Sequence, residues 1–174
     1  MALRSRFFDD DAKIGKIGED SLRNKLYAQK LKGNIQYYID NTMDPKSQRD
    51  DIDFTVLKLD GNTIKYECKT DCYGISTRNV SYEITSHDFA GCLGRSNSDY
   101  IYYVFVNENN EIAESYLIDL QKWREWIGNN ASDIKPFVRK SGEKLQLYYS
   151  KDIGVLQFLC NIDKMVDDKV AKKF

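Results

Sequence analysis

A stripe of apolar and small residues at helical spacing marks the first element of the chain. Four of them recur every four residues: Ile14, Gly18, Leu22 and Leu26. This spacing puts side chains on one face of a helix and predicts a helix over Ala12–Lys32. Asp9 to Asp11 precede it as N-capping residues with favourable charge, and Gly33 follows at the position of a C-terminal stop.

Runs of strand-forming residues separated by polar turns follow this helix. A loop is predicted over 41–51, and a short helix with a loop over 86–98. Two further helices are predicted, over Leu120–Ile127 after a capping Asp119 and over Ile162–Lys173. The runs themselves predict strands at Ile35–Asp40, Phe54–Leu59, Thr63–Thr70, Val80–Ile84, Tyr100–Val106, Ile112–Ile118 and Leu145–Tyr149. This order predicts one α/β (α+β) domain over residues 1–174, with a central mixed sheet flanked by helices.

Length and composition exclude several classes of protein. The chain has 174 residues, of which 41% are hydrophobic and 30% charged, which is typical of a globular domain and not of a disordered one. Its apolar runs, such as Ile101–Val106, are far shorter than the roughly 18 residues of a membrane span. The N-terminal segment lacks the apolar core and cleavage site of a signal peptide. We therefore expect a cytoplasmic, intracellular protein with no membrane partner.

The charge balance restricts the ways in which the chain can bind nucleic acid. The formal net charge is −1, whereas proteins that coat nucleic acid without selectivity are usually strongly basic. Any contact with nucleic acid must then come from a local basic patch. The first predicted helix carries several lysines, and Arg49 and Arg78 lie on predicted loops.

Four irregularly spaced cysteines and one histidine allow two interpretations. Reduced thiols that pack as small apolar groups fit a chain without a signal peptide. The alternative is a zinc site, which would have to combine Cys68, Cys72, Cys92 and His87 without any CxxC pair. Under the first interpretation His87 is a polar loop residue, with contact to a substrate left open.

A predicted hairpin carries the residues with the clearest chemical meaning. Asp60-Gly61 between two strand-forming runs is a strong turn signal, and the hairpin brings Asp53 beside Glu67, fourteen positions later. Glu67 and Lys69 point to one face of their strand, because strand side chains alternate. Two adjacent carboxylates repel each other unless a divalent cation lies between them. A lysine beside such a cation is suited to bind an attacking water or to stabilise developing charge.

These residues resemble the core motif of the PD-(D/E)xK nuclease superfamily. The matching residues are Asp53 and the triplet Glu67-Cys68-Lys69. The likeness extends over residues 15–106 through Gly18-Glu19, Gln48-Arg49, Asn79-Val80-Ser81-Tyr82-Glu83 and Ser96-Asn97-Ser98-Asp99-Tyr100. The chain departs from the pattern at Ile52, where the motif name has proline, and Asp51 is the reserve candidate for the motif aspartate.

The resemblance implies a restriction-endonuclease-like fold and a set of site residues. Mg²⁺, with Mn²⁺ able to replace it, would be bound by Asp53, Glu67, the backbone carbonyl of Cys68 and Glu19, directly or through water. Glu19, Asp53, Glu67 and Lys69 would be the catalytic residues, with Lys69 orienting or activating the water that attacks in line. Glu83 would either support this site or point outward.

The resemblance also implies a substrate and rival functions. The substrate would be DNA, bound at its phosphates by Arg49 and Arg78. The chain has no room for a separate sequence-reading domain, so a structure-selective endonuclease similar to Holliday-junction resolvases or phage endonucleases is expected, as a homodimer. The alternatives are an inactive relative that binds nucleic acid or protein, and an RNA-directed nuclease. We expect a positive rim around an acidic pocket, and binding that weakens steeply with salt.

Overall fold

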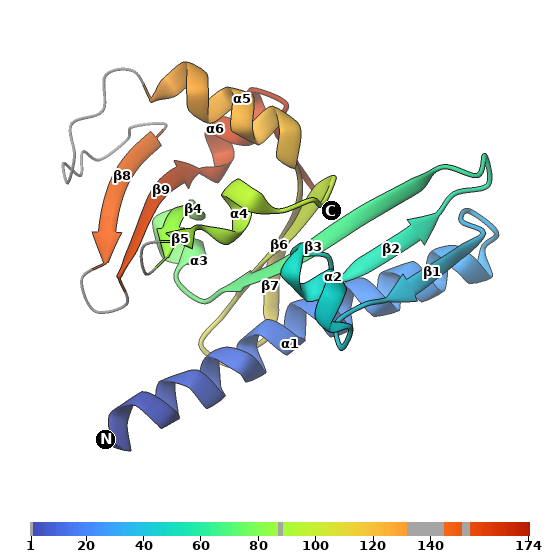
Figure 1. Ribbon diagram of the computed structural model, residues 1–174, viewed down its shortest axis with the longest axis horizontal. Coiled ribbons are helices and arrows are strands. Elements are labelled where there is room, and N and C mark those ends of the chain that lie inside the picture. Colours follow the sequence, from blue (N-terminus) through green and yellow to red (C-terminus); the bar gives the residue numbers. More distant parts are fainter. Residues whose placement is uncertain (1, 87–88, 132–144, 151–153) are drawn as a thin grey trace.

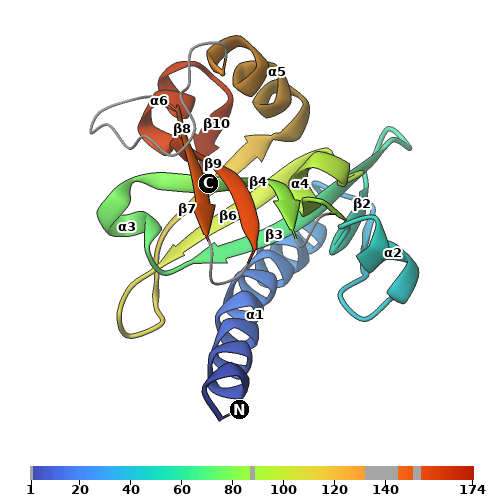
Figure 2. The same cartoon turned by 60° about the vertical axis from the view of Figure 1, so that its left-hand side comes forward.

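The computed structural model describes residues 2–86, 89–131, 145–150 and 154–174, and in these ranges the chain forms an α+β fold with two sheets (Figure 1). The long helix α1 (Ala2–Leu31) and the pair α5 (Leu120–Asn130) and α6 (Ile162–Asp167) lie at opposite ends of the molecule (Figure 2). Three short helices connect strands: α2 (Pro45–Arg49), α3 (Gly74–Thr77) and α4 (Cys92–Arg95). The expected central mixed sheet flanked by helices is therefore present.

The larger sheet has six strands in the order β1-β2-β3-β6-β7-β10. The strands are β1 (Tyr37–Asp40), β2 (Phe54–Leu57), β3 (Thr63–Asp71), β6 (Tyr100–Val106), β7 (Ile112–Asp119) and β10 (Ala171–Lys173). All neighbours are antiparallel except β3 and β6, which are parallel. The connection between those two strands carries α3, α4 and part of the second sheet. The site described below lies on β3, beside the end of β2.

The second sheet has four antiparallel strands in the order β5-β4-β9-β8. They are β4 (Asn79–Ser86), β5 (Phe89–Ala90), β8 (Leu145–Ser150) and β9 (Val155–Asn161). The sequence analysis predicted β4 and β8 but neither β9 nor a separate sheet. One face of this sheet packs with α5 and α6 on an apolar cluster that contains Val80, Tyr82, Trp123 and Cys160.

A second apolar cluster lies under α1, on the opposite face of the six-stranded sheet. Leu22 and Leu26 of α1 pack there on Phe54, Tyr102 and Val104, as the helical stripe predicts. The helix begins at Ala2, not near Ala12, so Asp9 to Asp11 lie inside it and the predicted N-cap is wrong. The predicted stop is confirmed, because Gly33 has a φ of +71° and its N–H donates to the Lys30 carbonyl.

Two other sequence predictions need correction. The predicted loop over 41–51 contains α2, which is capped by the Asp44 carboxylate accepting from the Ser47 N–H. The predicted helix over Ile162–Lys173 ends at Asp167, and Ala171–Lys173 pairs with β7 instead. A turn at Lys169, with a φ of +60°, separates the two segments. By contrast, Asp119 caps α5 as predicted, accepting from the Lys122 N–H at 3.1 Å.

Close packing of α1 on the sheet gives a stability prediction. A Cβ built at Gly18 would overlap Thr70 Oγ1, whereas a Cβ at Gly15 would meet nothing within 4 Å. We expect Gly18→Leu to lower the free energy of unfolding by about 2 kcal/mol or more, because the side chain has no room. Gly15→Leu is expected to be neutral or to raise it by about 0.5–1 kcal/mol through helix propensity. Urea unfolding of both variants checks this, and equal effects would contradict it.

Candidate functional site

The β2–β3 hairpin brings two carboxylates together. Phe54 pairs with Tyr66, and one further step of this antiparallel register sets Asp53 opposite Glu67. The Asp53 N–H donates to the Tyr66 carbonyl at 2.8 Å. Only 6% of the surface of each acidic residue is exposed. The hairpin therefore places the two predicted acids side by side and largely out of water.

The carboxylate of Asp53 is held by two donors. Gln48 Nε2 donates to Oδ1 at 2.9 Å, and the Cys68 backbone N–H donates to Oδ2 at 2.8 Å. β2 begins at Phe54 and pairs with β3 only as far as Tyr66, so among the described residues no strand pairs with this edge of β3 beyond that point. The N–H and C=O of one strand residue point to the same edge. The Cys68 carbonyl therefore points to the open edge where the Asp53 carboxylate lies.

The buried Glu67 forms an ion pair with the half-buried Lys69, two residues further along β3. The distance from Lys69 Nζ to Glu67 Oε1 is 2.9 Å. Burial raises the pKa of Glu67 to about 7, the Lys69 ammonium opposes this rise, and the charge of Asp53 adds to it. The desolvation that burial imposes on the carboxylate therefore outweighs the attraction of its lysine partner. A further positive charge at this place would favour the ionised form of Glu67.

Glu19 approaches from the face that α1 covers. Cys68 packs on the apolar cluster under α1, so the side chains of Glu67 and Lys69 point away from that helix. Burial, followed by the charge of Asp53, raises the pKa of Glu19, while Arg23 lowers it. Glu19 and Asp53 thus interact electrostatically.

The acidic residues do not form a ready-made three-ligand cluster. Within the ranges that the structure describes, no three His, Cys, Asp or Glu side chains converge as a metal-holding group. The arrangement instead offers the adjacent carboxylates of Asp53 and Glu67 and the carbonyl of Cys68 as oxygen donors, the type that Mg²⁺ prefers.

The reserve candidate, Asp51, has a different role. It lies in a turn with a φ of +52°, three residues before β2, and its carboxylate accepts from Arg95 Nε at 3.2 Å. Asp51 nevertheless contributes to the negative potential around Glu67. Because Asp53, and not Asp51, is bonded to the backbone of β3, the geometry favours Asp53 as the site aspartate.

The two predicted phosphate-binding arginines lie in different surroundings. Arg49 is exposed on α2, directly after the Gln48 that holds Asp53. Arg78 lies at the end of α3 and forms ion pairs with Glu114 at 2.6 Å and Asp163 at 2.7 Å. These bonds, the one to Asp163 above all, raise the pKa of Arg78. The structure therefore brings Arg49 near the site and uses Arg78 to tie α3 to β7 and α6.

The cysteine predictions are partly tested. Cys160 is fully buried and accepts from Trp123 Nε1, as expected for a small apolar residue, whereas Cys72 is exposed. His87 lies outside the described residues, and the side chain of Cys92 is not described. The zinc alternative therefore stays a prediction, as does a substrate contact of His87.

The sequence analysis missed two features beside the site. The first is the direct bond from Gln48 to Asp53; its only signal was the position of Gln48-Arg49 before the motif aspartate. The second is a cavity of about 670 Å³ between β3 and the second sheet, which both Lys69 and Glu83 line. Glu83 therefore points into this cavity.

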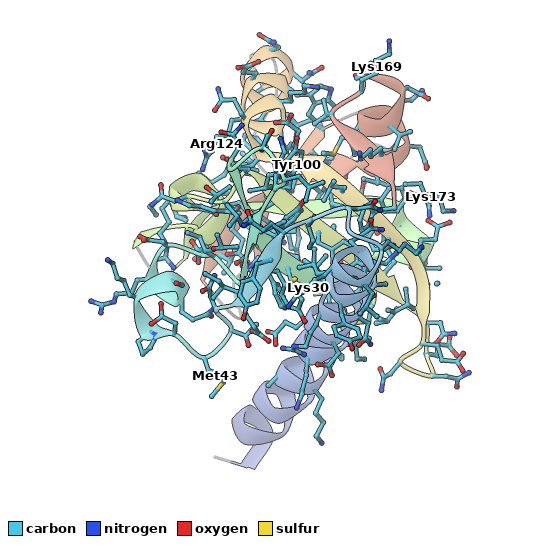
Figure 3. All side chains as sticks on the ribbon, turned by 90° about the vertical axis from the view of Figure 1, so that its right-hand side faces the viewer. Lys30, Met43, Tyr100, Arg124, Lys169 and Lys173 are labelled. Carbon is cyan, nitrogen blue, oxygen red and sulfur yellow. The ribbon has the colours of Figure 1, made fainter. Side chains whose placement is uncertain are left out.

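Loop residues next to the site are open to solvent. Met43, between β1 and α2, is 91% exposed and projects away from the protein (Figure 3). Lys30 lies on α1 in the same view, with its ammonium 4.4 Å from the centre of the Tyr37 ring. The expected positive rim around the acidic pair stays a prediction.

The shifted pKa of Glu67 predicts a pH dependence of stability in the absence of metal. The folded state binds the proton of the Glu67 carboxyl group more tightly than the unfolded chain does. The free energy of unfolding should therefore fall as the pH rises from about 4.5 through about 7. The loss attributable to Glu67 is on the order of 3 kcal/mol. Urea unfolding in EDTA across this range should show the fall in the parent and a flatter profile in Glu67→Gln. The exposed control Glu108→Gln should keep the parental profile, and a Glu67→Gln profile as steep as the parental one would contradict the prediction.

Comparison with protein families and with curated proteins gives no match from which a function could be inferred. No protein-family model matches the chain, and no curated protein matches it significantly. No helix within the described ranges is both long enough and apolar enough to cross a membrane.

Proposed function

We propose that this protein is a Mg²⁺-dependent nuclease that hydrolyses phosphodiester bonds in DNA. The observation that carries the proposal is the juxtaposition of Asp53 and Glu67 across the β2–β3 hairpin, with Lys69 bonded to Glu67. The arrangement of α1, the antiparallel strands β1–β3 and the parallel strand β6 is compatible with a restriction-endonuclease-like fold. It supports the resemblance to the PD-(D/E)xK superfamily at the residues that carry it.

The donor set fits a divalent cation. Asp53 and Glu67 would bind the ion with the Cys68 carbonyl, and Glu19 would contribute through water. The raised pKa of Glu67 supports this assignment, because a buried carboxylate that is costly to ionise alone gains most from a nearby cation. Mg²⁺, or Mn²⁺ in its place, would activate water and neutralise charge on the leaving oxygen.

The residues of the chain have separate tasks in this proposal. Gln48 and the Cys68 N–H fix the orientation of the Asp53 carboxylate before substrate binds. Lys69 donates a hydrogen bond to the attacking water or to a non-bridging phosphate oxygen, which places its positive charge where negative charge develops. Glu67 keeps the Lys69 ammonium in position through their 2.9 Å ion pair. Arg49 binds a flanking phosphate.

The preferred substrate is branched or otherwise distorted DNA, cut by a homodimer. Phosphate contacts dominate the recognition of such DNA and make it sensitive to salt.

Incubation with plasmid, linear duplex, branched DNA and RNA tests the proposal. With Mg²⁺ or Mn²⁺ we expect cleavage of DNA, fastest on the branched substrate, and none in EDTA. Cleavage of RNA alone would replace the DNA assignment with the RNA-directed alternative. No cleavage of any substrate, together with no binding of divalent ions by calorimetry, would show an inactive binding module instead.

A further inference from the structure

The floor of the cavity beside Lys69 is formed mainly by polar side chains on one face of the second sheet. One face of the second sheet packs on the apolar cluster around Trp123, and the opposite face lines the cavity. The strand register sets its residues in two rows across β4, β9 and β8. The rows are Glu83, Gln157, Tyr148 and Ser81, Leu159, Gln146. Lys69 and Asp71 of β3 form part of the facing wall.

The size of the cavity suits a small molecule or a single residue of a polymer. Its volume of about 670 Å³ falls within the roughly 300–1,000 Å³ of typical ligand sites. A DNA duplex cannot enter a space of this size, because only a base taken out of the stack fits such a pocket. If the cavity binds part of a nucleic acid, it therefore selects for an unpaired base.

The chemistry of the lining favours a nucleobase over a phosphate. Gln146 and Gln157 offer amide groups that match the hydrogen-bonding edges of bases, and Tyr148 offers a ring for stacking. Glu83 would repel a phosphate, but its carboxylate suits the exocyclic amino group of a base. Asp71 adds negative charge to the wall, while its carboxylate accepts from the Tyr73 and Gly74 N–H groups and the Tyr103 hydroxyl. The hydroxyl of Ser81 contacts Gln157 Oε1, which fixes the orientation of that amide.

The position of Lys69 connects the cavity to the proposed cleavage site. Lys69 lines the cavity, and its ammonium is bonded to Glu67 of the acidic pair. We propose, on the basis of the nuclease function above, that the cavity receives one unpaired base of a DNA strand next to the phosphate being cut. The enzyme would then act on single-stranded, flapped or bulged positions and not on uninterrupted duplex.

Equilibrium binding in EDTA tests this inference without requiring catalysis. Fluorescence anisotropy with a labelled single-stranded oligonucleotide and with the same sequence as duplex should show the single strand bound at least about fivefold more tightly. The double variant Gln146→Ala/Gln157→Ala and the cavity-filling Leu159→Trp should each lose that preference. Gln36→Ala, an exposed glutamine before β1, should retain it. Far-ultraviolet circular dichroism and thermal unfolding confirm that each variant is folded.

The outcomes separate this inference from the nuclease proposal. Equal affinity of the parent for single strand and duplex, or a preference unchanged in both folded cavity variants, would overturn the role of the cavity even if the protein cuts DNA. A preference that depends on the cavity, in a protein that never cuts DNA, would support the cavity while removing the nuclease proposal.

Discussion

Replacing Asp53 with asparagine is expected to lower Mg²⁺-dependent DNA cleavage by more than about a hundredfold. The amide keeps the shape of the side chain but removes the negative charge that would bind the cation beside Glu67. It also weakens the bond from the Cys68 N–H, which is charge-assisted in the parent. Initial cleavage rates at saturating Mg²⁺, with calorimetric titration of Mn²⁺, measure both losses.

Asp50→Asn is the matched control for this change. Asp50 belongs to the same acidic stretch, but it ends α2 and has no bond to the Asp53 carboxylate or to β3. We expect its cleavage rate and its affinity for Mn²⁺ to equal those of the parent. Undiminished cleavage by Asp53→Asn would exclude Asp53 from the site and return attention to Asp51.

Replacing Lys69 with methionine is expected to reduce cleavage by about 10²–10⁴-fold, the range typical for loss of a group that assists proton transfer or stabilises charge. Methionine preserves the apolar part of the side chain at the cavity wall. Metal binding should persist, because Lys69 is not an oxygen ligand. The separation of the two effects, slow cleavage with retained Mn²⁺ affinity, distinguishes a role in chemistry from a role in holding the ion.

Lys65→Met provides the comparison on the same strand and the same face. Lys65 lies four residues before Lys69 on β3, pairs with Thr55 of β2 and is outside the cavity lining. Its replacement removes an equal charge without removing the bond to Glu67. Equal losses of cleavage in the two variants would show that overall charge, and not the Lys69–Glu67 pair, controls the rate.

The candidate site shows how far local patterns can predict the arrangement of residues. Asp53 and Glu67 meet because a short turn and alternating side chains define a hairpin almost entirely by local sequence. The support that Gln48 gives to Asp53 was not predicted, because it depends on the short helix α2 folding back in a stretch with the composition of a loop. The ion pairs of Arg78 were not predicted either, because its partners Glu114 and Asp163 are distant in sequence.

The sequence by itself determined the apolar face of α1, the β2–β3 hairpin, the buried strand β6 and the cap of α5, all of which follow from contacts within a few residues. The tertiary structure decided the parallel pairing of β3 with β6, the pairing of β10 with β7 and the separate second sheet. The physical reason is that a periodic pattern specifies which side of a strand is buried but not which distant strand completes its hydrogen bonds. That choice depends on the packing of the whole chain, and it created the cavity beside Lys69.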